Sequence, residues 1–174
     1  MQFVSIDPGK KNTCIVVAYS DPLCQFVCID RVFLLESHAL SKSGVQNLLQ
    51  TLSVVANPDA IFIVENQVAA ISGKSNSNIV YNNFVQAIII GYCHEKCLLV
   101  ESHAKLRLKY LKDQFMVQPS ESKTILATRL VEQLDAVWSD AAFDFVQSNP
   151  HSVPHVMDCI AQMAFEILEN HIMK

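Results

Sequence analysis

Three acidic residues stand where the surrounding pattern favours apolar or neutral side chains. Asp7 follows the apolar run 2–6, Glu65 follows the apolar run 60–64, and Asp158 lies in an amphipathic segment near the C-terminal end. Carboxylates that converge on one point can hold the divalent metal ions of phosphodiester hydrolysis. Two such ions, about 4 Å apart, generate the attacking hydroxide and neutralise the leaving oxygen. A metal-dependent phosphodiester hydrolase is therefore the first hypothesis.

The two strand-end acids can meet only if their strands are neighbours. Run 60–64 is short, continuous and rich in β-branched residues, as a buried central strand would be. If it pairs in parallel with strand 2–7, Asp7 and Glu65 lie at one carboxyl edge of the sheet, where α/β folds commonly place their sites. Simpler interpretations stay open, because Asp7 precedes the turn signal Pro8-Gly9 and Glu65 could only mark where a strand meets solvent.

The third acid lies on a helix expected from Pro154 to about residue 171. At 100° per residue, the apolar stripe that faces the core comprises Val156, Ile160, Met163, Ala164 and Ile167. The opposite face carries His155, Gln162, Glu166 and Glu169. Asp158 falls at the rim between the two faces.

His155 and Asp158 are three residues apart, so both project to one side of this helix and can reach one metal ion. Both also lie near its N-terminus, where the helix dipole favours a carboxylate and disfavours an imidazolium. We therefore expect His155 to stay neutral and free to bind metal. The alternative is an exposed or capping histidine.

The remaining elements follow from periodicity and turn signals. Strands are expected at 2–7, 13–20, 25–35, 60–64 and 97–100, and helices at about 38–55, 79–95, 104–112, 124–137 and 154–171. Residues 71–78 form a polar loop, and the stretch that ends at Asn149-Pro150 has no clear pattern. The fold class is α/β, with a five-stranded mixed sheet of three antiparallel strands followed by parallel strands, flanked by helices. We expect a single domain over residues 1–174.

Composition limits the class of protein. The chain has 51% hydrophobic and 17% charged residues, which is enough to bury one sizeable core. Its most apolar stretch, 84–93, is far shorter than the roughly 20 residues that a membrane span needs. The six cysteines include two pairs with three-residue gaps, but neither pair has a second ligand pair at zinc-finger spacing, so we expect reduced thiols.

Charge is distributed unevenly along the chain. The net charge is −4, yet residues 105–129 hold six basic residues against two acids. Such a stripe is typical of a local surface that binds a nucleic-acid backbone, although a solvated charged helix is an equally simple interpretation. The segment Gly73-Lys74-Ser75 is not a nucleotide-binding loop, because Val68 stands where that motif requires glycine.

Four segments, in chain order, resemble the motifs of RuvC-type Holliday-junction resolvases, the poxvirus-like resolvases included, which have the RNase H-like fold. Residues 5–13 resemble the first-strand motif and residues 63–67 the fourth-strand motif. Residues 122–124 are similar to the lysine segment, and residues 154–161 to the terminal helix.

The resemblance implies a homodimeric, Mg²⁺-dependent endonuclease that nicks opposing strands of a four-way DNA junction, with Mn²⁺ able to substitute and two ions per site. The metal ligands would be Asp7, Glu65, His155 and Asp158, and Lys123 would assist them in catalysis. The candidate DNA contacts are Lys10, Lys11, Lys74, Lys105, Arg107, Lys109 and Lys112.

Other functions stay open. The same acids would serve an RNase H-like nuclease that acts on other branched DNA or on an RNA/DNA hybrid. A non-enzymatic nucleic-acid-binding member of the fold is a further alternative.

Residues 68–71 lack the aromatic that bacterial members use to open the junction. Because residues 2–6 already form a strand, we expect no leader, no mitochondrial presequence and a cytoplasmic protein of bacterial, phage or viral origin.

Overall fold

The computed structural model describes residues 1–9, 11–20, 27–36, 40–65, 77–94, 96–102, 113 and 136–169. Within this part of the chain no helix is both long and apolar enough to cross a membrane. Several predictions lie outside the described residues. They are most of the loop 71–78, the helix 104–112, most of the helix 124–137, and seven basic site residues: Lys10, Lys74, Lys105, Arg107, Lys109, Lys112 and Lys123.

The centre of the molecule is a six-stranded mixed sheet in the order β5-β4-β1-β2-β3-β6. The strands are β1 (Gln2–Asp7), β2 (Thr13–Ser20), β3 (Val27–Leu35), β4 (Ala60–Glu65), β5 (Leu98–Ser102) and β6 (Ala136–Trp138). β2 pairs antiparallel with β1 and with β3, whereas β4 pairs parallel with β1 and β5. This confirms the mixed sheet with three antiparallel strands first.

The sixth strand was not predicted. β6 pairs parallel with β3, with Val27 opposite Ala136 and Ile29 opposite Trp138. The expected helix 124–137 is therefore wrong at its end. A strand of three residues at the edge of a sheet carries no periodicity of its own, and its pairing with β3 fixes its conformation.

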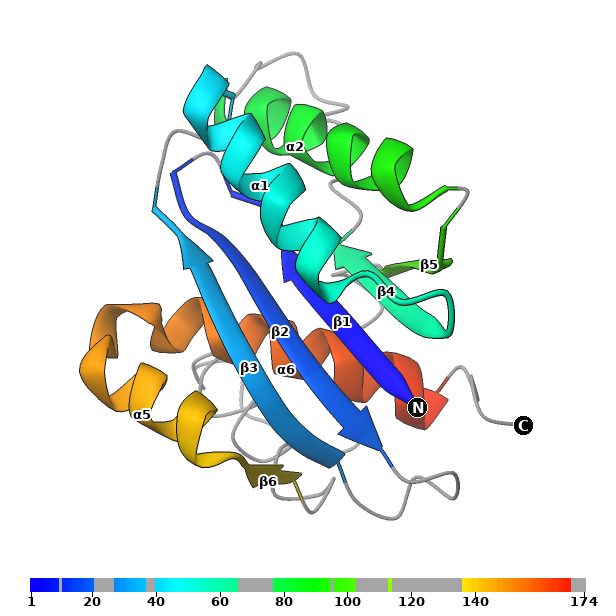
Figure 1. Ribbon diagram of the computed structural model, residues 1–174, viewed down its shortest axis with the longest axis vertical. Coiled ribbons are helices and arrows are strands. Elements are labelled where there is room, and N and C mark those ends of the chain that lie inside the picture. The colour runs from blue at the N-terminus through cyan, green and yellow to red at the C-terminus, as the bar shows by residue number, and fades with distance from the viewer. Residues whose placement is uncertain are drawn as a thin grey trace.

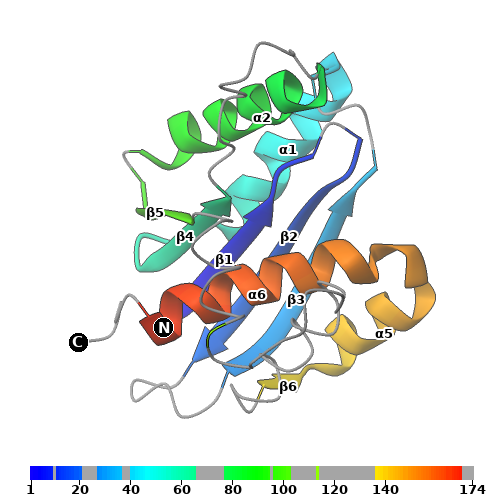
Figure 2. The same ribbon diagram turned by 180° about the vertical axis from the view of Figure 1, so that it is seen from behind.

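Helices cover both faces of the sheet (Figures 1 and 2). One face carries α1 (Lys42–Val55) and α2 (Ser77–Cys93), and the other carries α5 (Asp140–Ser148) and α6 (Val153–Glu169), which the short 3₁₀ turn η1 (Pro150–Ser152) joins. The two faces bury separate apolar clusters, called here the α1/α2-side core and the α6-side core.

Serine caps explain where two helices begin. Ser41 accepts a hydrogen bond from the Gly44 backbone N–H at 3.0 Å, so α1 starts at Lys42 rather than at about 38. Ser139 accepts from the Ala142 N–H at 3.1 Å and starts α5, a helix that the sequence pattern did not predict.

The apolar stripe of α6 is confirmed, but the prediction for its opposite face is wrong. Gln162 is 0% exposed and Glu166 is 1% exposed, although both were expected to face solvent. Gln162 donates from Nε2 to the Ile6 carbonyl at 3.3 Å, so its amide is buried with a backbone partner. A single-helix projection identifies the more apolar face but not how many sides the fold will cover.

Candidate metal centre and active site

The register of the sheet brings the first two acids together. β1 and β4 pair in parallel with Ile6 opposite Val64, so Asp7 and Glu65 are the next residues of two adjacent strands. Both acids lie at the carboxyl ends of these strands, as predicted. The Asp7 side chain is 18% exposed, and Glu65 is partly buried.

Side-chain alternation shows which face Asp7 occupies. On β1, Phe3 belongs to the α6-side core, whereas Val4 and Ile6 belong to the α1/α2-side core. Ser5 donates its hydroxyl to the Cys159 carbonyl of α6 at 2.8 Å. Asp7 is two residues beyond Ser5, so its carboxylate lies on the α6 side.

The same alternation holds on β4. Ile61 and Ile63 pack in the α6-side core, whereas Phe62 and Val64 pack in the α1/α2-side core. Glu65 therefore lies on the α6 side too, beside Asp7. Both carboxylates are presented to the helix that carries the third predicted acid.

α6 brings His155 into direct contact with Asp7. The imidazole Nδ1 donates to Asp7 Oδ2 at 3.1 Å, across 148 residues of sequence. The His155 side chain is 33% exposed, so the pair lies at the surface of the site and not in the core. α6 therefore places His155 beside the strand-end acid Asp7.

The expectation that the surroundings of His155 disfavour its protonated form is wrong. The hydrogen bond to Asp7 raises the pKa of His155 above its usual 6.5; burial opposes this rise, and the charges of Asp7 and Asp158 add to it. His155 does lie in the first turn of α6, as expected. The charges of two carboxylates near the imidazole outweigh the effect of the helix dipole on its pKa. The sequence pattern does not show that these carboxylates come so close.

Asp158 lies one turn after His155 on α6 and is partly buried. Residues three apart on a helix project to the same side, so Asp158 lies on the His155 side of α6, and its charge raises the pKa of His155. Asp7, Glu65, His155 and Asp158 thus come from two strand ends and one helix that meet at a single edge of the sheet.

Asn12 is a neighbour of the site that sequence reasoning did not assign. Its side-chain Nδ2 lies 3.5 Å from His155 Nε2, at the limit of a hydrogen bond. The β1–β2 turn holds Asn12 there, and this turn needs glycine because a Cβ on Gly9 would overlap the Asn12 carbonyl oxygen. The available signal was the position of Asn12 in the same turn as Pro8-Gly9, five residues after Asp7.

The residues present suit a hard divalent cation. Three carboxylates offer oxygen ligands of the kind that Mg²⁺ and Mn²⁺ prefer, and His155 adds a nitrogen that suits Mn²⁺. As the side chains stand, no three His, Cys, Asp or Glu residues within the described part of the chain are grouped closely enough to hold an ion. Asp7 instead accepts a hydrogen bond from His155 Nδ1, which leaves Nε2 as the ring nitrogen that could bind an ion.

Nearby thiols do not compete as ligands. Burial, followed by a hydrogen bond with Cys14, raises the pKa of Cys159 well above its usual value of 9.0. Its Sγ donates to the Cys14 carbonyl at 3.5 Å. Both cysteines are fully buried in the α6-side core, so they are packing residues beneath the site.

Among the predicted DNA-contacting residues, Lys11 is the one that the structure describes. It is exposed in the β1–β2 turn, next to Asn12 and on the same edge of the sheet as Asp7. This position suits a contact with a phosphate that approaches the acids.

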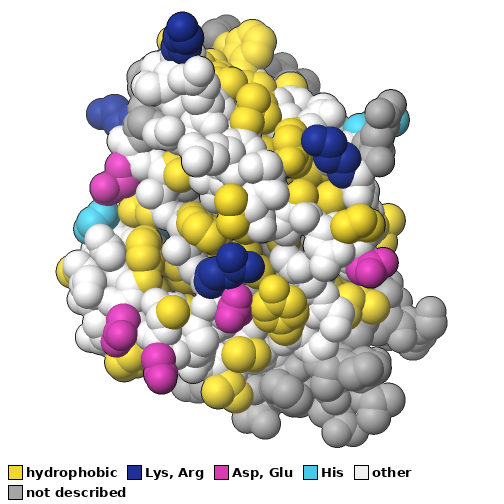
Figure 3. Space-filling view, viewed as in Figure 1, with side chains coloured by type: hydrophobic (Ala, Val, Ile, Leu, Met, Phe, Trp, Pro, Cys, Tyr) yellow, Lys and Arg dark blue, Asp and Glu magenta, His cyan; other side chains and the backbone are white. Residues whose placement is uncertain are grey.

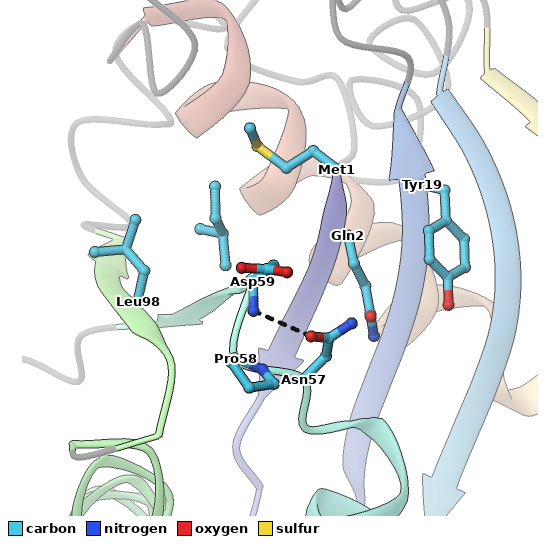
Figure 4. Close-up of a pocket in the computed structure, with 8 residues that line it drawn as sticks. Met1, Gln2, Tyr19, Asn57, Pro58, Asp59 and Leu98 are labelled. Atoms are coloured by element: carbon cyan, nitrogen blue, oxygen red, sulfur yellow. Dashed lines mark hydrogen bonds between the residues drawn. The ribbon is translucent and has the colours of Figure 1, made fainter.

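A pocket of about 720 Å³ lies at the other end of the central strands, where β1 begins. Figure 4 shows its lining at the start of β1, with Met1 and Gln2 beside Tyr19, Asp59 and Leu98. Since β1 runs from this pocket to Asp7, the pocket is separated from the acids by the length of the strand. It is not the predicted active site.

The six-stranded mixed sheet with helices on both faces agrees with the predicted RNase H-like fold class. No family model and no curated protein sequence matches the chain. Solved structures match over nearly all of it.

The chain is similar to the yeast mitochondrial Holliday junction resolvase Ydc2, with 12% identity and a TM-score of 0.66 over 98% of this chain and 81% of that one. It is also similar to the RuvC of T. thermophilus in complex with a Holliday junction substrate, with 11% identity and a TM-score of 0.61 over 99% of this chain and 96% of that one. A third similar structure is the Fowlpox virus resolvase in complex with its junction DNA, with 14% identity and a TM-score of 0.58 over 97% of this chain and 100% of that one. At these identities the likeness establishes the fold.

Proposed function

We propose that this protein is a Holliday-junction resolvase, a metal-dependent endonuclease that nicks four-way DNA junctions symmetrically. The observation that carries the proposal is the meeting of Asp7, Glu65 and the His155–Asp158 turn of α6 at one edge of the sheet. Resolvases with the same fold, two of them in complex with junction DNA, support the choice of substrate.

When bound, two Mg²⁺ ions, or Mn²⁺ in their place, would supply activated water and neutralise charge on the phosphate. Asp7 and Glu65 would hold the metal from the sheet, and His155 and Asp158 would hold it from α6. His155 would have to be neutral to serve as a ligand, and Asp7 would orient it by accepting a hydrogen bond from Nδ1. Lys123 acts beside the scissile phosphate.

The proposed DNA contacts are Lys11 on the site edge and, outside the described residues, Lys10, Lys74, Lys105, Arg107, Lys109 and Lys112. Contacts with phosphates supply affinity that does not depend on the acids. Binding and cleavage are therefore separable in this protein.

The proposed homodimer forms through the outer face of α2, a helix without any charged residue. This face exposes Val80 (44%) and Phe84 (57%), followed at helical spacing by the exposed small residues Ala87 and Gly91. A Cβ on Gly91 would meet nothing within 4 Å, so this end of the stripe is open for a close-packed partner. Hydrophobic side chains are open to solvent in this part of the surface (Figure 3).

Two copies related by a two-fold axis would present two sites to two strands, as symmetric nicking requires. α2 would then pack against α2 of the second copy. The small residues at one end of the stripe would allow the two backbones to approach closely.

A substrate panel tests the proposed function. The purified chain, with Mg²⁺ or Mn²⁺, is incubated with a four-way junction, a flap, a plain duplex and an RNA/DNA hybrid of matched sequence. Paired symmetric nicks in the junction, at rates well above those on the other substrates, are expected. Preferred cleavage of the hybrid or the flap would assign a different nuclease activity, and binding of DNA without cleavage would assign a non-enzymatic role.

Asp59→Asn is a matched control for the acids in this panel. Asp59 is exposed in the turn before β4, at the opposite edge of the sheet from Asp7. Its substitution removes one carboxylate without touching the site, so cleavage by this variant should equal that of the unchanged protein.

A further inference from the structure

Two buried side-chain polar atoms in the described part of the chain have no hydrogen-bond partner: Asn83 Oδ1 and Ser102 Oγ. An unpartnered buried hydroxyl is costly, since it has lost its water without gaining another partner. Asn83 belongs to α2, on the face of the sheet away from the acids. Ser102 is the last residue of β5 and is 0% exposed.

The register of the sheet places Ser102 beside Glu65. β4 and β5 pair in parallel, with Glu65 directly opposite Ser102 at the carboxyl ends of the two strands. Directly opposite residues on adjacent strands have side chains on the same face and Cβ atoms about 5 Å apart. A serine hydroxyl can therefore reach a glutamate carboxylate across the ladder.

The contacts of β5 fix the face on which Ser102 lies. Val100 packs against the α6-side core, whereas Leu99 packs against the α1/α2-side core. Glu101 accepts a hydrogen bond from Gln86 of α2 at 3.4 Å, so it lies on the α1/α2 side. Ser102 therefore lies on the α6 side, where Glu65 and Asp7 also lie.

We infer that Ser102 is a positioning residue that orients the Glu65 carboxylate in the metal-bound protein. A carboxylate that binds a metal through one oxygen keeps its other oxygen available as an acceptor, and groups that hold this second oxygen tune metal affinity. The Ser102 hydroxyl donates to it when Glu65 turns toward the ion. Since Ser102 is fully buried, it does not touch DNA, and it acts on the reaction only through Glu65.

The inference rests on the proposed function, because it takes Glu65 as a metal ligand. The test measures Mn²⁺ binding to the full chain without DNA. The electron paramagnetic resonance signal of the free ion reports how much Mn²⁺ is bound. The second measurement is the thermal unfolding midpoint of the metal-free protein. Neither readout depends on cleavage.

Two variants separate the effect of losing the hydroxyl donor from the effect of changing the side-chain volume. Ser102→Ala removes the donor and a small volume, whereas Ser102→Cys keeps the volume with a much weaker donor. Both should bind Mn²⁺ about tenfold more weakly than the unchanged protein. Neither should lower the unfolding midpoint of the metal-free protein, because the hydroxyl has no partner there to lose.

Ser139→Ala is the matched control. The Ser139 hydroxyl donates to the Asp30 carbonyl at 2.6 Å and accepts from the Ala142 N–H, and it lies at the β3–β6 edge of the sheet. Its loss should lower the unfolding midpoint and leave Mn²⁺ affinity unchanged, which is the opposite pattern.

A double variant tests whether Ser102 acts on metal binding through Glu65. In a Glu65→Gln background, Ser102→Ala should cause no further loss of Mn²⁺ affinity, because the two residues act as one unit. Additive losses, normal affinity in both Ser102 variants, or normal affinity in Ser102→Cys alone would overturn the role of the hydroxyl. If the unchanged protein binds no Mn²⁺, or Glu65→Gln binds it normally, the proposed metal site itself fails.

Discussion

His155 Nδ1 lies 3.1 Å from Asp7 Oδ2, which joins the first turn of the last helix to the end of the first strand. The contact links two of the four predicted metal ligands through a proton in the metal-free protein. A ring nitrogen binds metal only when it carries no proton, so metal binding at this site competes with full protonation of His155.

The acids can be tested one at a time. Asp7→Asn, Glu65→Gln and Asp158→Asn should each lower the rate of junction cleavage at least about a hundredfold, because a bound metal contributes several kcal/mol to stabilising the transition state. Junction affinity, measured by fluorescence anisotropy in Ca²⁺, should remain close to that of the unchanged protein. Full cleavage by any one variant would remove that residue from the site.

The titration of His155 follows from its contact with Asp7. Its pKa in the metal-free protein should lie above 6.5, and Asp7→Asn should lower it by removing both the ionic hydrogen bond and the charge. Two-dimensional NMR of the imidazole resonances measures both values. A pKa at or below 6.5 in the unchanged protein would contradict the prediction.

The same shift sets the direction of two pH effects. Since the folded pKa is raised, protonated His155 stabilises the metal-free fold below about pH 6.5, and this stability is lost as pH rises through the folded pKa. Metal requires the neutral imidazole, so Mn²⁺ affinity should fall as pH falls through the same value. Thermal unfolding midpoints and Mn²⁺ titrations across pH 5 to 8 measure the two trends.

Substitution of His155 should change the preferred metal. Nitrogen ligands suit Mn²⁺ more than Mg²⁺, so the unchanged protein should cleave at lower concentrations of Mn²⁺ than of Mg²⁺. His155→Asp should keep activity and shift the preference toward Mg²⁺, whereas His155→Ala should be severely impaired at limiting metal. His151→Ala is the control, because His151 is exposed and pairs with Glu36 at 2.7 Å. An active His155→Ala variant would show that this histidine binds no metal.

The dimer prediction depends on the exposed stripe of α2. Phe84→Glu should weaken association by about 2 kcal/mol or more, roughly thirtyfold in Kd, if Phe84 is central to the interface. Phe143→Glu on α5 is a matched control, because Phe143 is 52% exposed and Phe84 is 57% exposed. Light scattering at micromolar concentration, with and without junction DNA, measures the mass. A monomer under both conditions, or equal effects of the two variants, would exclude α2 as the interface.

The basic residues should divide into two groups. Alanine at Lys11, Lys105, Arg107, Lys109 or Lys112 should weaken binding to all duplex arms alike and reduce the salt dependence by about one unit per lost phosphate contact. Lys123→Ala should lower the cleavage rate more than the affinity, because it acts on charge that develops in the transition state. Lys96→Gln, in the turn before β5, is the control. Equal affinity losses at all positions would remove the separate role of Lys123.

Local sequence determined the elements that carry the acids. The alternating and continuous apolar runs gave β1 and β2 with the bounds seen in the structure, and they placed Asp7 and Glu65 at the ends of their strands. The 3.6-residue period gave the buried stripe of α6, with His155 and Asp158 in its first turns. These features depend on a residue and its near neighbours, which is the information that periodicity contains.

The tertiary structure alone decided what those elements meet. The sixth strand, the burial of Gln162 and Glu166, and the pairing of Ser102 with Glu65 depend on residues far apart in the chain. The raised pKa of His155 has the same origin, since Asp7 is 148 residues away. A helix dipole can be inferred from position within a helix, but a carboxylate 3.1 Å away comes only from the fold, and at that distance it outweighs the dipole.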